Sequence, residues 1–205
     1  MRPRIAIVDY GMGNLRSAFR GLQKCGAEPV ITAEKRVIRE CDALVLPGVG
    51  AFELAVRRLE GLRECILREV EDGKPLLGIC LGLQLLFPVS EEGSGRGLGL
   101  LRGRVKRLPE GVKVPHMGWN SVRILRSSPL MKGLDDGEFF YFVHSYYASP
   151  EEEITVAVCE HGTEFPAVVQ KGGVFATQFH PEKSGRAGLR LLKNFVEVAG
   201  YDKGV

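Results

Sequence analysis

The sequence predicts an α/β fold: an open, mostly parallel sheet with helices on both faces, followed by an antiparallel β extension in the second half. In the first half of the chain, apolar strand patterns alternate with amphipathic helix patterns. The strand patterns are continuous apolar runs, as expected for strands that helices cover on both faces. From Leu100 to Pro181, strand patterns separated by turn residues dominate, and these indicate the antiparallel extension.

The expected strands of the first half are short and are bounded by turn residues. In chain order they are Arg4–Asp9, Pro29–Thr32, Asp42–Leu46 and Pro75–Ile79. The turn Pro47-Gly48-Val49-Gly50 closes the third of them, which is the expected neighbour of the fourth.

The expected helices of the first half are amphipathic. Apolar residues recur with helical period from Leu15 to Cys25 and from Phe52 to Val70, in each case until a glycine stops the pattern. A further helix, Leu81–Phe87, directly follows the fourth strand.

The second half consists mainly of expected strands. In chain order these are Arg102–Leu108, Trp119–Leu125, Glu138–Ala148, Thr155–Glu160, Ala167–Lys171 and Val174–Phe179. His161-Gly162 and Gly172-Gly173 are typical of hairpin turns, and an amphipathic helix ends the chain. No linker divides the pattern, so we expect residues 1–205 to form a single domain.

The composition is that of an ordinary globular protein, with 44% hydrophobic and 26% charged residues, which argues against disorder. No apolar stretch is long enough for a transmembrane helix, and the N-terminus does not resemble a signal peptide. A net charge of +3 is too small to indicate nucleic-acid binding. The five cysteines lack paired spacing, which predicts a reducing, cytoplasmic location.

The segment Gly78-Ile79-Cys80-Leu81-Gly82 joins an apolar strand to a helix. A nucleophile with a glycine two residues away on each side of such a turn is typical of a nucleophile elbow. The positive end of the helix dipole favours a Cys80 thiolate, and the Leu81 N–H is placed to bind an oxyanion. The segment therefore indicates a catalytic cysteine, although a buried cysteine in an ordinary turn shares the pattern.

A base and its orienting acid are expected near His180. His180 follows an apolar strand in Gln178-Phe179-His180-Pro181-Glu182, and Glu182 can reach the same imidazole. A carboxylate on one ring nitrogen leaves the other nitrogen to face the thiol. The Pro-Gly-Val-Gly turn at residues 47–50 could bring further backbone N–H groups to an oxyanion.

These motifs resemble a known family. Cys80 in GICLGLQLLF, His180 and Glu182 in QFHPEKS, and the PGVG turn are similar to class I, triad-type glutamine amidotransferases. Within that family, VDYGMGNLRS, KVPHMGWN and FVHSYY resemble the glutaminase subunits of imidazole glycerol phosphate synthases. The resemblance covers nearly the whole chain and implies a flavodoxin-like sheet. Leu83, where members often carry Met, and Pro88, which shortens the elbow helix, are small departures.

The resemblance implies hydrolysis of glutamine to glutamate and ammonia. Cys80 would attack the carboxamide and form a γ-glutamyl thioester, while His180, oriented by Glu182, moves the proton. The oxyanion-hole positions implied by the resemblance are Val49, Gly50 and Leu81. The implied substrate-binding positions are Gly48, Gln84, His144, Ser145 and Tyr146.

The resemblance also implies a partner. Ammonia would pass to a separate (β/α)8 cyclase subunit, and this heterodimer would make imidazole glycerol phosphate and aminoimidazole carboxamide ribotide in histidine biosynthesis. We expect no residues of this chain to remain for a synthase domain. The positions that match the family's subunit interface, or lie near it, are Asn14, His116, Met117, Gly118, Trp119, Asn120 and Lys183.

No metal or cofactor is expected. Cys159 and His161 lack the second ligand pair of a zinc site, and the GMGN segment at residues 11–14 lacks the third glycine of a dinucleotide fingerprint. The four cysteines other than Cys80 are interpreted as small core residues: Cys25, Cys41, Cys65 and Cys159.

Two other functions stay open on the residues alone. A cysteine peptidase or γ-glutamyl hydrolase of similar fold would use the same elbow, but peptidase relatives commonly carry a histidine where this chain has Leu81. A non-enzymatic, glutamine-sensing or interacting subunit would not need Cys80, His180 and Glu182 together. Apart from the resemblance, the residues alone favour Gln84 as an exposed helix residue and residues 144–146 as a segment that packs at a strand end.

Overall fold

The computed structural model describes residues 2–201. Its strands are, in chain order, β1 (Arg4–Val8), β2 (Glu28–Thr32), β3 (Ala43–Gly48), β4 (Leu76–Cys80), β5 (Gly103–Arg107), β6 (His116–Ile124), β7 (Glu138–His144), β8 (Tyr146–Pro150), β9 (Thr155–Glu160), β10 (Glu164–Lys171) and β11 (Val174–Thr177). Its helices are α1 (Leu15–Lys24), α2 (Lys35–Glu40), α3 (Phe52–Glu71), α4 (Leu81–Gln84) and α5 (Gly185–Tyr201), with the short 3-10 helices η1 (Pro129–Met131) and η2 (Pro181–Lys183).

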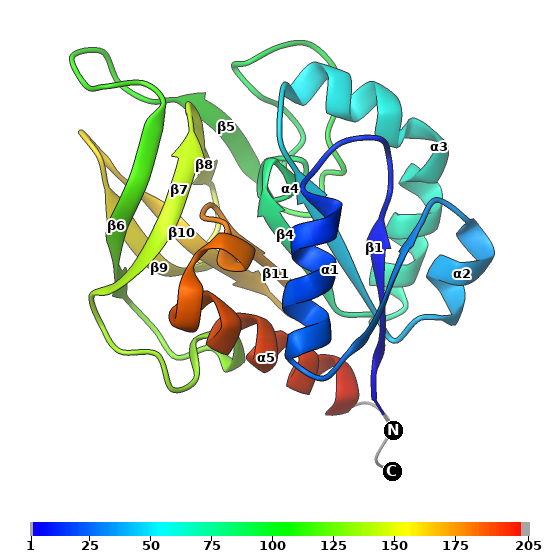
Figure 1. Ribbon diagram of the computed structural model, residues 1–205. Helices are drawn as coiled ribbons and strands as arrows, with labels where there is room; N and C mark the ends of the chain where they lie inside the picture. Colours follow the sequence, from blue (N-terminus) through cyan, green and yellow to red (C-terminus); the bar gives the residue numbers. More distant parts are fainter. Residues whose placement is uncertain (1, 202–205) are drawn as a thin grey trace.

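One sheet of nine strands runs through the described residues in the order β2-β1-β3-β4-β11-β10-β9-β6-β7. The strands from β2 to β11 in that order are mutually parallel. In Figure 1, α1 and α5 lie on one face of this parallel part, and α2 and α3 lie on the other side. The predicted α/β fold with helices on both faces is therefore confirmed.

The remaining strands form the predicted antiparallel extension. Strand β10 forms hairpins with both β9 and β11, and β6 pairs antiparallel with β9 and with β7. Strand β11 thus joins the two parts, since it is parallel to β4 on one side and antiparallel to β10 on the other. Strands β5 and β8 form a separate two-stranded sheet.

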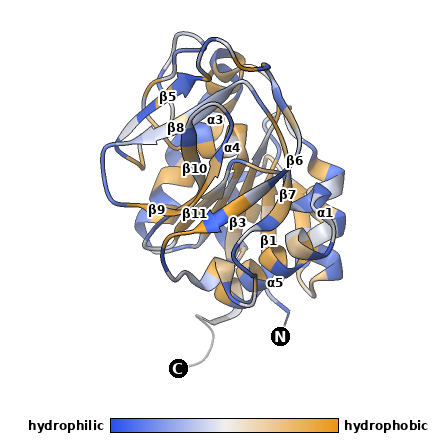
Figure 2. Ribbon diagram, turned by 90° about the vertical axis from the view of Figure 1, so that its left-hand side faces the viewer, coloured by the Kyte–Doolittle hydropathy of each residue, from blue (hydrophilic) through white to orange (hydrophobic). Residues whose placement is uncertain are grey.

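The core lies on both faces of the main sheet. One apolar cluster fills the space under α1 and α5, around Leu22, Phe140 and Phe195. The other lies under α3 and includes Phe52 and Phe87. Figure 2 shows hydrophobic residues gathered in the strands and on parts of the helices. Strands β3 and β4 are buried along their whole length, which explains their continuous apolar sequences.

Three local features differ from the sequence prediction. Helix α2 was not expected, because Ile38 is its only buried residue and no apolar periodicity marks it. Helix α4 ends at Gln84 rather than Phe87, because the next two hydrogen bonds, from Leu86 N–H to the Leu83 carbonyl and from Phe87 N–H to the Gln84 carbonyl, span only three residues. Pro88 also disfavours helical backbone at Phe87. The segment expected as one strand, Glu138–Ala148, is two strands, since the chain leaves β6 at Ser145 and then pairs with β5.

Within residues 2–201, no helix combines the length and apolar character needed to cross a membrane.

Candidate active site

The parallel strands bring the predicted catalytic segments to one edge of the sheet. Strands β3 and β4 are neighbours, and Gly48 is the register partner of Cys80. Strand β11 lies on the other side of β4 and ends at Thr177, three residues before His180. The carboxyl ends of parallel strands meet at one edge, where open α/β sheets place their ligand sites.

Cys80 occupies a strained turn between β4 and α4. Its φ of 54° makes it the only non-glycine residue with positive φ in the described part of the chain. The turn also needs two flanking glycines, because the backbone passes close by. A Cβ on Gly82 would overlap the Leu46 carbonyl oxygen, and one on Gly78 would lie 2.9 Å from the Gly82 carbonyl group. This is the geometry of a nucleophile elbow.

His180 and Glu182 form a buried pair beside Cys80. The His180 Nδ1 atom lies 2.8 Å from Glu182 Oε1, and both side chains are almost fully buried. Burial by itself lowers the pKa of His180, but the Cys80 sulfur and the Glu182 carboxylate outweigh it and raise this pKa to about 10. The surroundings therefore favour the protonated, imidazolium form of His180. His180 Nε2 is buried and makes no hydrogen bond of ordinary geometry within residues 2–201.

The Cys80 sulfur has two further neighbours. The Gln178 side-chain amide donates a hydrogen bond to it over 3.8 Å, and the Val143 carbonyl oxygen lies 3.7 Å away. Gln178 itself is fully buried, and its Oε1 is without a partner among the described residues. Sequence reasoning named His180 and Glu182 in the same motif but missed this amide contact.

A cavity of about 330 Å³ opens beside Cys80. Its size is adequate for a small amino acid. The lining consists of Val49, Gly50, Cys80, Leu81, Gln84, Glu92, Pro115, Val143, His144, Ser145 and Tyr146. The structure thus brings together most of the residues that the resemblance named for the oxyanion hole and the substrate.

Gly48 is the exception, because it does not line the cavity. A Cβ on Gly48 would lie 2.7 Å from Leu81 Cβ and 2.8 Å from Tyr10 Oη. Gly48 therefore allows β3 to pass close to the elbow. The Tyr10 hydroxyl is also held there, since it donates a 2.7 Å hydrogen bond to the Pro47 carbonyl oxygen.

Two polar cavity residues are held by defined contacts. The Gln84 side-chain amide donates to the Tyr146 carbonyl oxygen over 2.9 Å, so Gln84 is buried rather than exposed on its helix. Glu92 accepts a 2.8 Å hydrogen bond from the Phe52 N–H at the start of α3. Sequence reasoning missed Glu92, Pro115 and Val143, because no local pattern places a loop residue in a cavity formed by distant strands.

Comparisons with known proteins identify the family. The family model of class I glutamine amidotransferases matches residues 6–199. The chain belongs to the class I glutamine amidotransferase family. A relative from Methanothermobacter thermautotrophicus, named imidazole glycerol phosphate synthase subunit HisH, is 54% identical over 195 residues, which are 95% of this chain and 98% of the relative. A Bacillus cereus relative of the same name is also 54% identical, over 95% of this chain and 94% of its own length.

Solved structures agree at the level of the fold. A structure titled PurLQS from Thermotoga maritima matches with a TM-score of 0.76 and 22% identity, covering 97% of this chain and 99% of the other. A structure titled glutamine amidotransferase matches with a TM-score of 0.74 and 24% identity, covering 95% of this chain and 98% of the other.

The residues expected at a subunit interface of this amidotransferase differ in exposure. Met117 and Trp119 on β6 are 61% and 56% exposed. Lys183 is exposed, with its ammonium 5.8 Å from the ring centre of Tyr141, and the Tyr141 ring also contacts Trp119 edge-on. Asn14, Gly118 and Asn120 are half-buried. His116 is only 5% exposed, so this residue lies beneath the surface rather than on it.

The remaining cysteines of the amidotransferase lie in or beside the core, as predicted. Cys41, Cys65 and Cys159 are buried, and Cys25 is half-buried against the cluster under α1 and α5. Burial raises the pKa of the Cys159 thiol to about 12. Among the described residues, no cluster of three or more His, Cys, Asp or Glu side chains could hold a metal ion.

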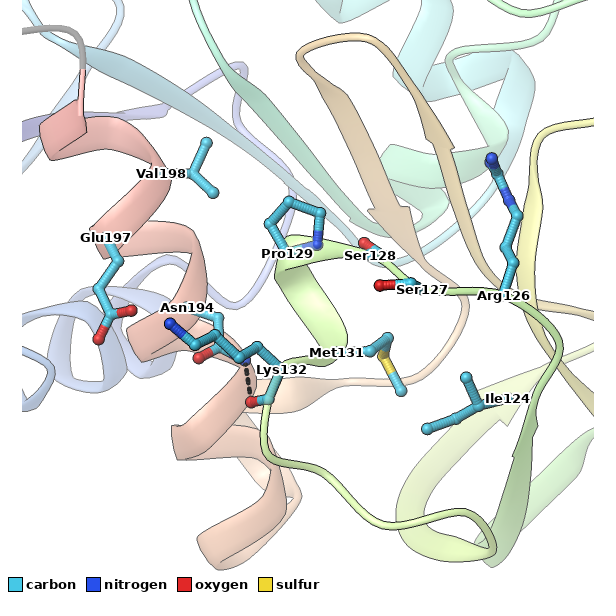
Figure 3. A pocket seen from close by; sticks show the side chains of 10 residues that line it. All are labelled: Ile124, Arg126, Ser127, Ser128, Pro129, Met131, Lys132, Asn194, Glu197 and Val198. Atoms are coloured by element: carbon cyan, nitrogen blue, oxygen red, sulfur yellow. Dashed lines mark hydrogen bonds between the residues drawn. The ribbon is translucent and has the colours of Figure 1, made fainter.

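A larger cavity of about 640 Å³ lies elsewhere, between the end of β6, η1 and α5 (Figure 3). Several of its polar side chains form hydrogen bonds within the fold. Asn194 donates hydrogen bonds to the Leu130 and Lys132 carbonyl oxygens, and Arg126 donates to those of Ile154 and Gln170. None of the residues predicted for the site lines this cavity.

Proposed function

We propose that this chain is the glutamine amidotransferase subunit of an imidazole glycerol phosphate synthase. It hydrolyses glutamine and supplies the ammonia to a cyclase partner that makes imidazole glycerol phosphate in histidine biosynthesis. The observation that carries the proposal is the buried Cys80, His180 and Glu182 cluster, in a chain 54% identical over 95% of its length to subunits of that enzyme.

The first half-reaction releases ammonia. The Cys80 thiolate attacks the side-chain carbonyl carbon of glutamine and forms a tetrahedral oxyanion. The C–N bond then breaks as the His180 imidazolium donates its proton to the leaving nitrogen, which gives ammonia and a γ-glutamyl thioester. Glu182, 2.8 Å from His180 Nδ1, holds the ring in the orientation that this transfer needs.

The second half-reaction regenerates the enzyme. Neutral His180 removes a proton from water, which attacks the thioester carbon, and the C–S bond breaks to give glutamate and the Cys80 thiolate. The Leu81 N–H at the start of α4 and the N–H groups of Val49 and Gly50 are the groups proposed to stabilise the oxyanion in both steps.

Recognition of the amino-acid end of glutamine is proposed for the far side of the cavity. Glu92 offers a carboxylate for the α-ammonium group. Gln84 presents its side-chain oxygen in an orientation that the hydrogen bond from its nitrogen to Tyr146 fixes. His144, Ser145 and Tyr146 form the strand end that closes this side. Gly48 supports this site through backbone packing rather than through direct contact.

The proposed surface for the (β/α)8 cyclase subunit centres on β6. Met117 and Trp119 are exposed on it, and tryptophan is a typical anchor of protein interfaces, in which methionine is also enriched. Lys183 and Asn14 are proposed to belong to the same surface, with Asn120 at its margin. We also propose that residues 1–205 form one domain and that the protein works in the cytoplasm, where a reducing environment preserves the Cys80 thiol.

The test is glutamate release measured with and without the cyclase subunit and its nucleotide ligand. We expect low activity from the chain alone and a large increase in the complex. Cys80→Ala should abolish the activity, whereas Cys159→Ala, which removes a buried and unreactive thiol, should retain it. Turnover that does not depend on the partner, or that persists in Cys80→Ala, would contradict the proposal.

A further inference from the structure

A continuous chain of polar side chains, buried at His116 and His144 and half-buried at Asn120, connects β6 with the cavity beside Cys80. The Asn120 amide nitrogen lies 3.2 Å from His116 Nε2, and His116 Nδ1 lies 3.0 Å from His144 Nε2. His144 Nδ1 lies 2.9 Å from the Tyr146 carbonyl oxygen, which also accepts the Gln84 amide. His116 and His144 are register partners on β6 and β7, so the two rings meet across the strand pair.

The Tyr146 carbonyl oxygen, at one end of this chain, determines which nitrogen of each imidazole ring carries a hydrogen. A carbonyl oxygen can only accept, so His144 Nδ1 must carry a hydrogen. If His144 is neutral, its Nε2 is an acceptor, and His116 Nδ1 must then donate to it. Neutral His116 is left with Nε2 as an acceptor, which suits the amide hydrogen of Asn120.

The contacts of Asn120, at the other end of the chain, independently give the same hydrogen positions on the two rings. Its side-chain oxygen accepts from the Ser121 N–H over 2.9 Å, and its nitrogen donates to the Glu160 carbonyl oxygen over 2.9 Å. These two backbone groups fix which end of the amide is nitrogen. Asn120 can therefore only donate to His116, and every hydrogen bond between the two fixed ends points the same way.

We propose that Asn120 and His116 are positioning residues that hold His144 as the neutral Nδ1–H form, and through it orient the Tyr146 carbonyl and the Gln84 amide for glutamine binding. The set Asn120, His116 and His144 is called the imidazole relay below. This role rests on the proposed function, since it assigns Gln84 to the glutamine site.

The surroundings of the imidazole relay favour neutral rings. His116 stacks between Phe142, at 4.9 Å, and His161, at 4.2 Å between ring centres. Phe165 lies edge-on to His144 at 5.0 Å. Burial lowers the pKa of His116 to about 4 and that of His144 to about 3. A proton added to either ring would place two donors face to face and break a link of the relay.

The consequence for the site lies in the Tyr146 carbonyl. It accepts from His144 and from Gln84, so both hydrogen bonds fix its direction. Because one hydrogen of the Gln84 amide is held there, the orientation of the amide is fixed, and Oε1 and the second amide hydrogen are left for the substrate. The relay thus connects the orientation of the Gln84 amide with strand β6. The same strand carries the exposed residues Met117 and Trp119.

The direct test is the tautomeric state of the histidines by long-range proton–nitrogen correlation NMR of the full chain with labelled histidine at neutral pH. Single His→Gln variants assign the signals. We expect His116 and His144 as neutral Nδ1–H forms. His161 is the internal reference, because its Nε2 donates to the Lys113 carbonyl oxygen over 2.8 Å and must carry a hydrogen. A cationic ring or an Nε2–H form at His116 or His144 overturns the proposal.

The functional test is steady-state glutamine hydrolysis in the complex with the cyclase subunit. His116→Phe keeps an aromatic ring between Phe142 and His161 but cannot bond to His144. We expect KM for glutamine to rise about fivefold to tenfold, because the variant loses one buried hydrogen bond. The kcat should stay within about threefold of the wild-type value. The matched control is His161→Phe, which alters the same stack outside the relay and should leave KM within about twofold.

A second variant tests the same role in case His116→Phe does not fold. Asn120→Asp is nearly isosteric but replaces the donor by a carboxylate, so His116 must take a proton on Nε2. We expect that change in the NMR spectrum together with a raised KM. Unchanged KM in both His116→Phe and Asn120→Asp, or equal effects in His161→Phe, overturns the positioning role. If the wild-type complex releases no glutamate, the proposed function fails, and the tautomers still decide whether the relay exists.

Discussion

Cys80 combines three constraints that rarely coincide at a cysteine. It adopts a positive φ, it precedes a helix, and it lies beside the His180 and Glu182 pair. A non-glycine residue in this region of backbone space costs of order 1–3 kcal/mol, so the surrounding fold must stabilise it. The strain holds the sulfur at the sheet edge, where the imidazolium can face it.

The dependence of His180 on Glu182 gives a prediction at this scale. In Glu182→Gln the imidazolium loses a carboxylate that helps to raise its pKa to about 10, so the pKa of His180 should fall. We expect kcat for glutamine hydrolysis to drop about 100-fold or more. The alkaline limb of the kcat profile should move to lower pH.

The control for this variant is Glu164→Gln. Glu164, at the exposed first position of β10, pairs with Arg123 of β6 and does not line the cavity beside Cys80. Its kcat should match that of the wild type. A Glu182→Gln enzyme with near-normal kcat and an unchanged pH profile would show that the carboxylate does not orient His180.

At the scale of elements, the site depends on how closely β4, α4 and β3 approach one another. Gly82 lies against the backbone of β3, where the Leu46 carbonyl oxygen leaves no room for a Cβ. The break between β7 and β8 at Ser145 is equally important, because it turns residues 143–146 toward the cavity. Both features arise where elements meet rather than within one element.

The approach of Gly82 to β3 predicts a large stability cost for Gly82→Ala. The added Cβ forces the backbone apart, and we expect a loss of about 3 kcal/mol in the free energy of unfolding, measured by urea denaturation. Gly61→Ala is the matched control, since Gly61 lies within α3 and a Cβ added there would meet nothing within 4 Å. It should stabilise the protein by about 0.5–1 kcal/mol. Equal effects of the two substitutions would contradict the packing argument.

At the scale of the molecule, the parallel part carries Cys80 and His180, the proposed nucleophile and base, and the antiparallel part supplies one wall of the cavity. His144 and Tyr146 belong to that wall, and the imidazole relay lies between β6, β7 and β10. This part of the molecule contains the buried rings of His116 and His144, whose lowered pKa values keep them neutral in the folded protein. Folding therefore becomes linked to proton binding by these two rings.

This linkage predicts a pH dependence of stability. His116 and His144 have folded pKa values of about 4 and about 3, below the ordinary value of 6.5. As pH falls below about 6.5, the unfolded chain binds protons at these rings before the folded protein does, so the free energy of unfolding decreases. We expect the decrease in urea unfolding experiments between pH 6.5 and pH 4.

The contribution of one ring is isolated by comparison with His116→Phe. Carboxylates also titrate toward the lower end of this range, and they are common to both proteins. The wild type should lose up to about 1.4 kcal/mol more per pH unit than His116→Phe. Parallel pH curves for the two proteins would rule out a neutral, buried His116 in the folded state.

The sequence by itself determined the order of most elements, the elbow and the pairing of His180 with Glu182. Continuous apolar runs mark strands that helices cover, and they extend over β1, β3 and β4. The glycines around Cys80 and the short spacing between His180 and Glu182 are local requirements of a turn and of one hydrogen bond. Local chemistry of this kind can be recognised from neighbouring residues alone.

Only the tertiary structure decided what the strands of the second half pair with and which polar residues become buried. Glu92 lines the cavity, His116 lies beneath the surface, and Ser145 separates two strands of different sheets. Each of these outcomes depends on contacts between segments far apart in the sequence. A local pattern records what one segment favours, whereas strand pairing and burial depend on the partner that the rest of the chain provides.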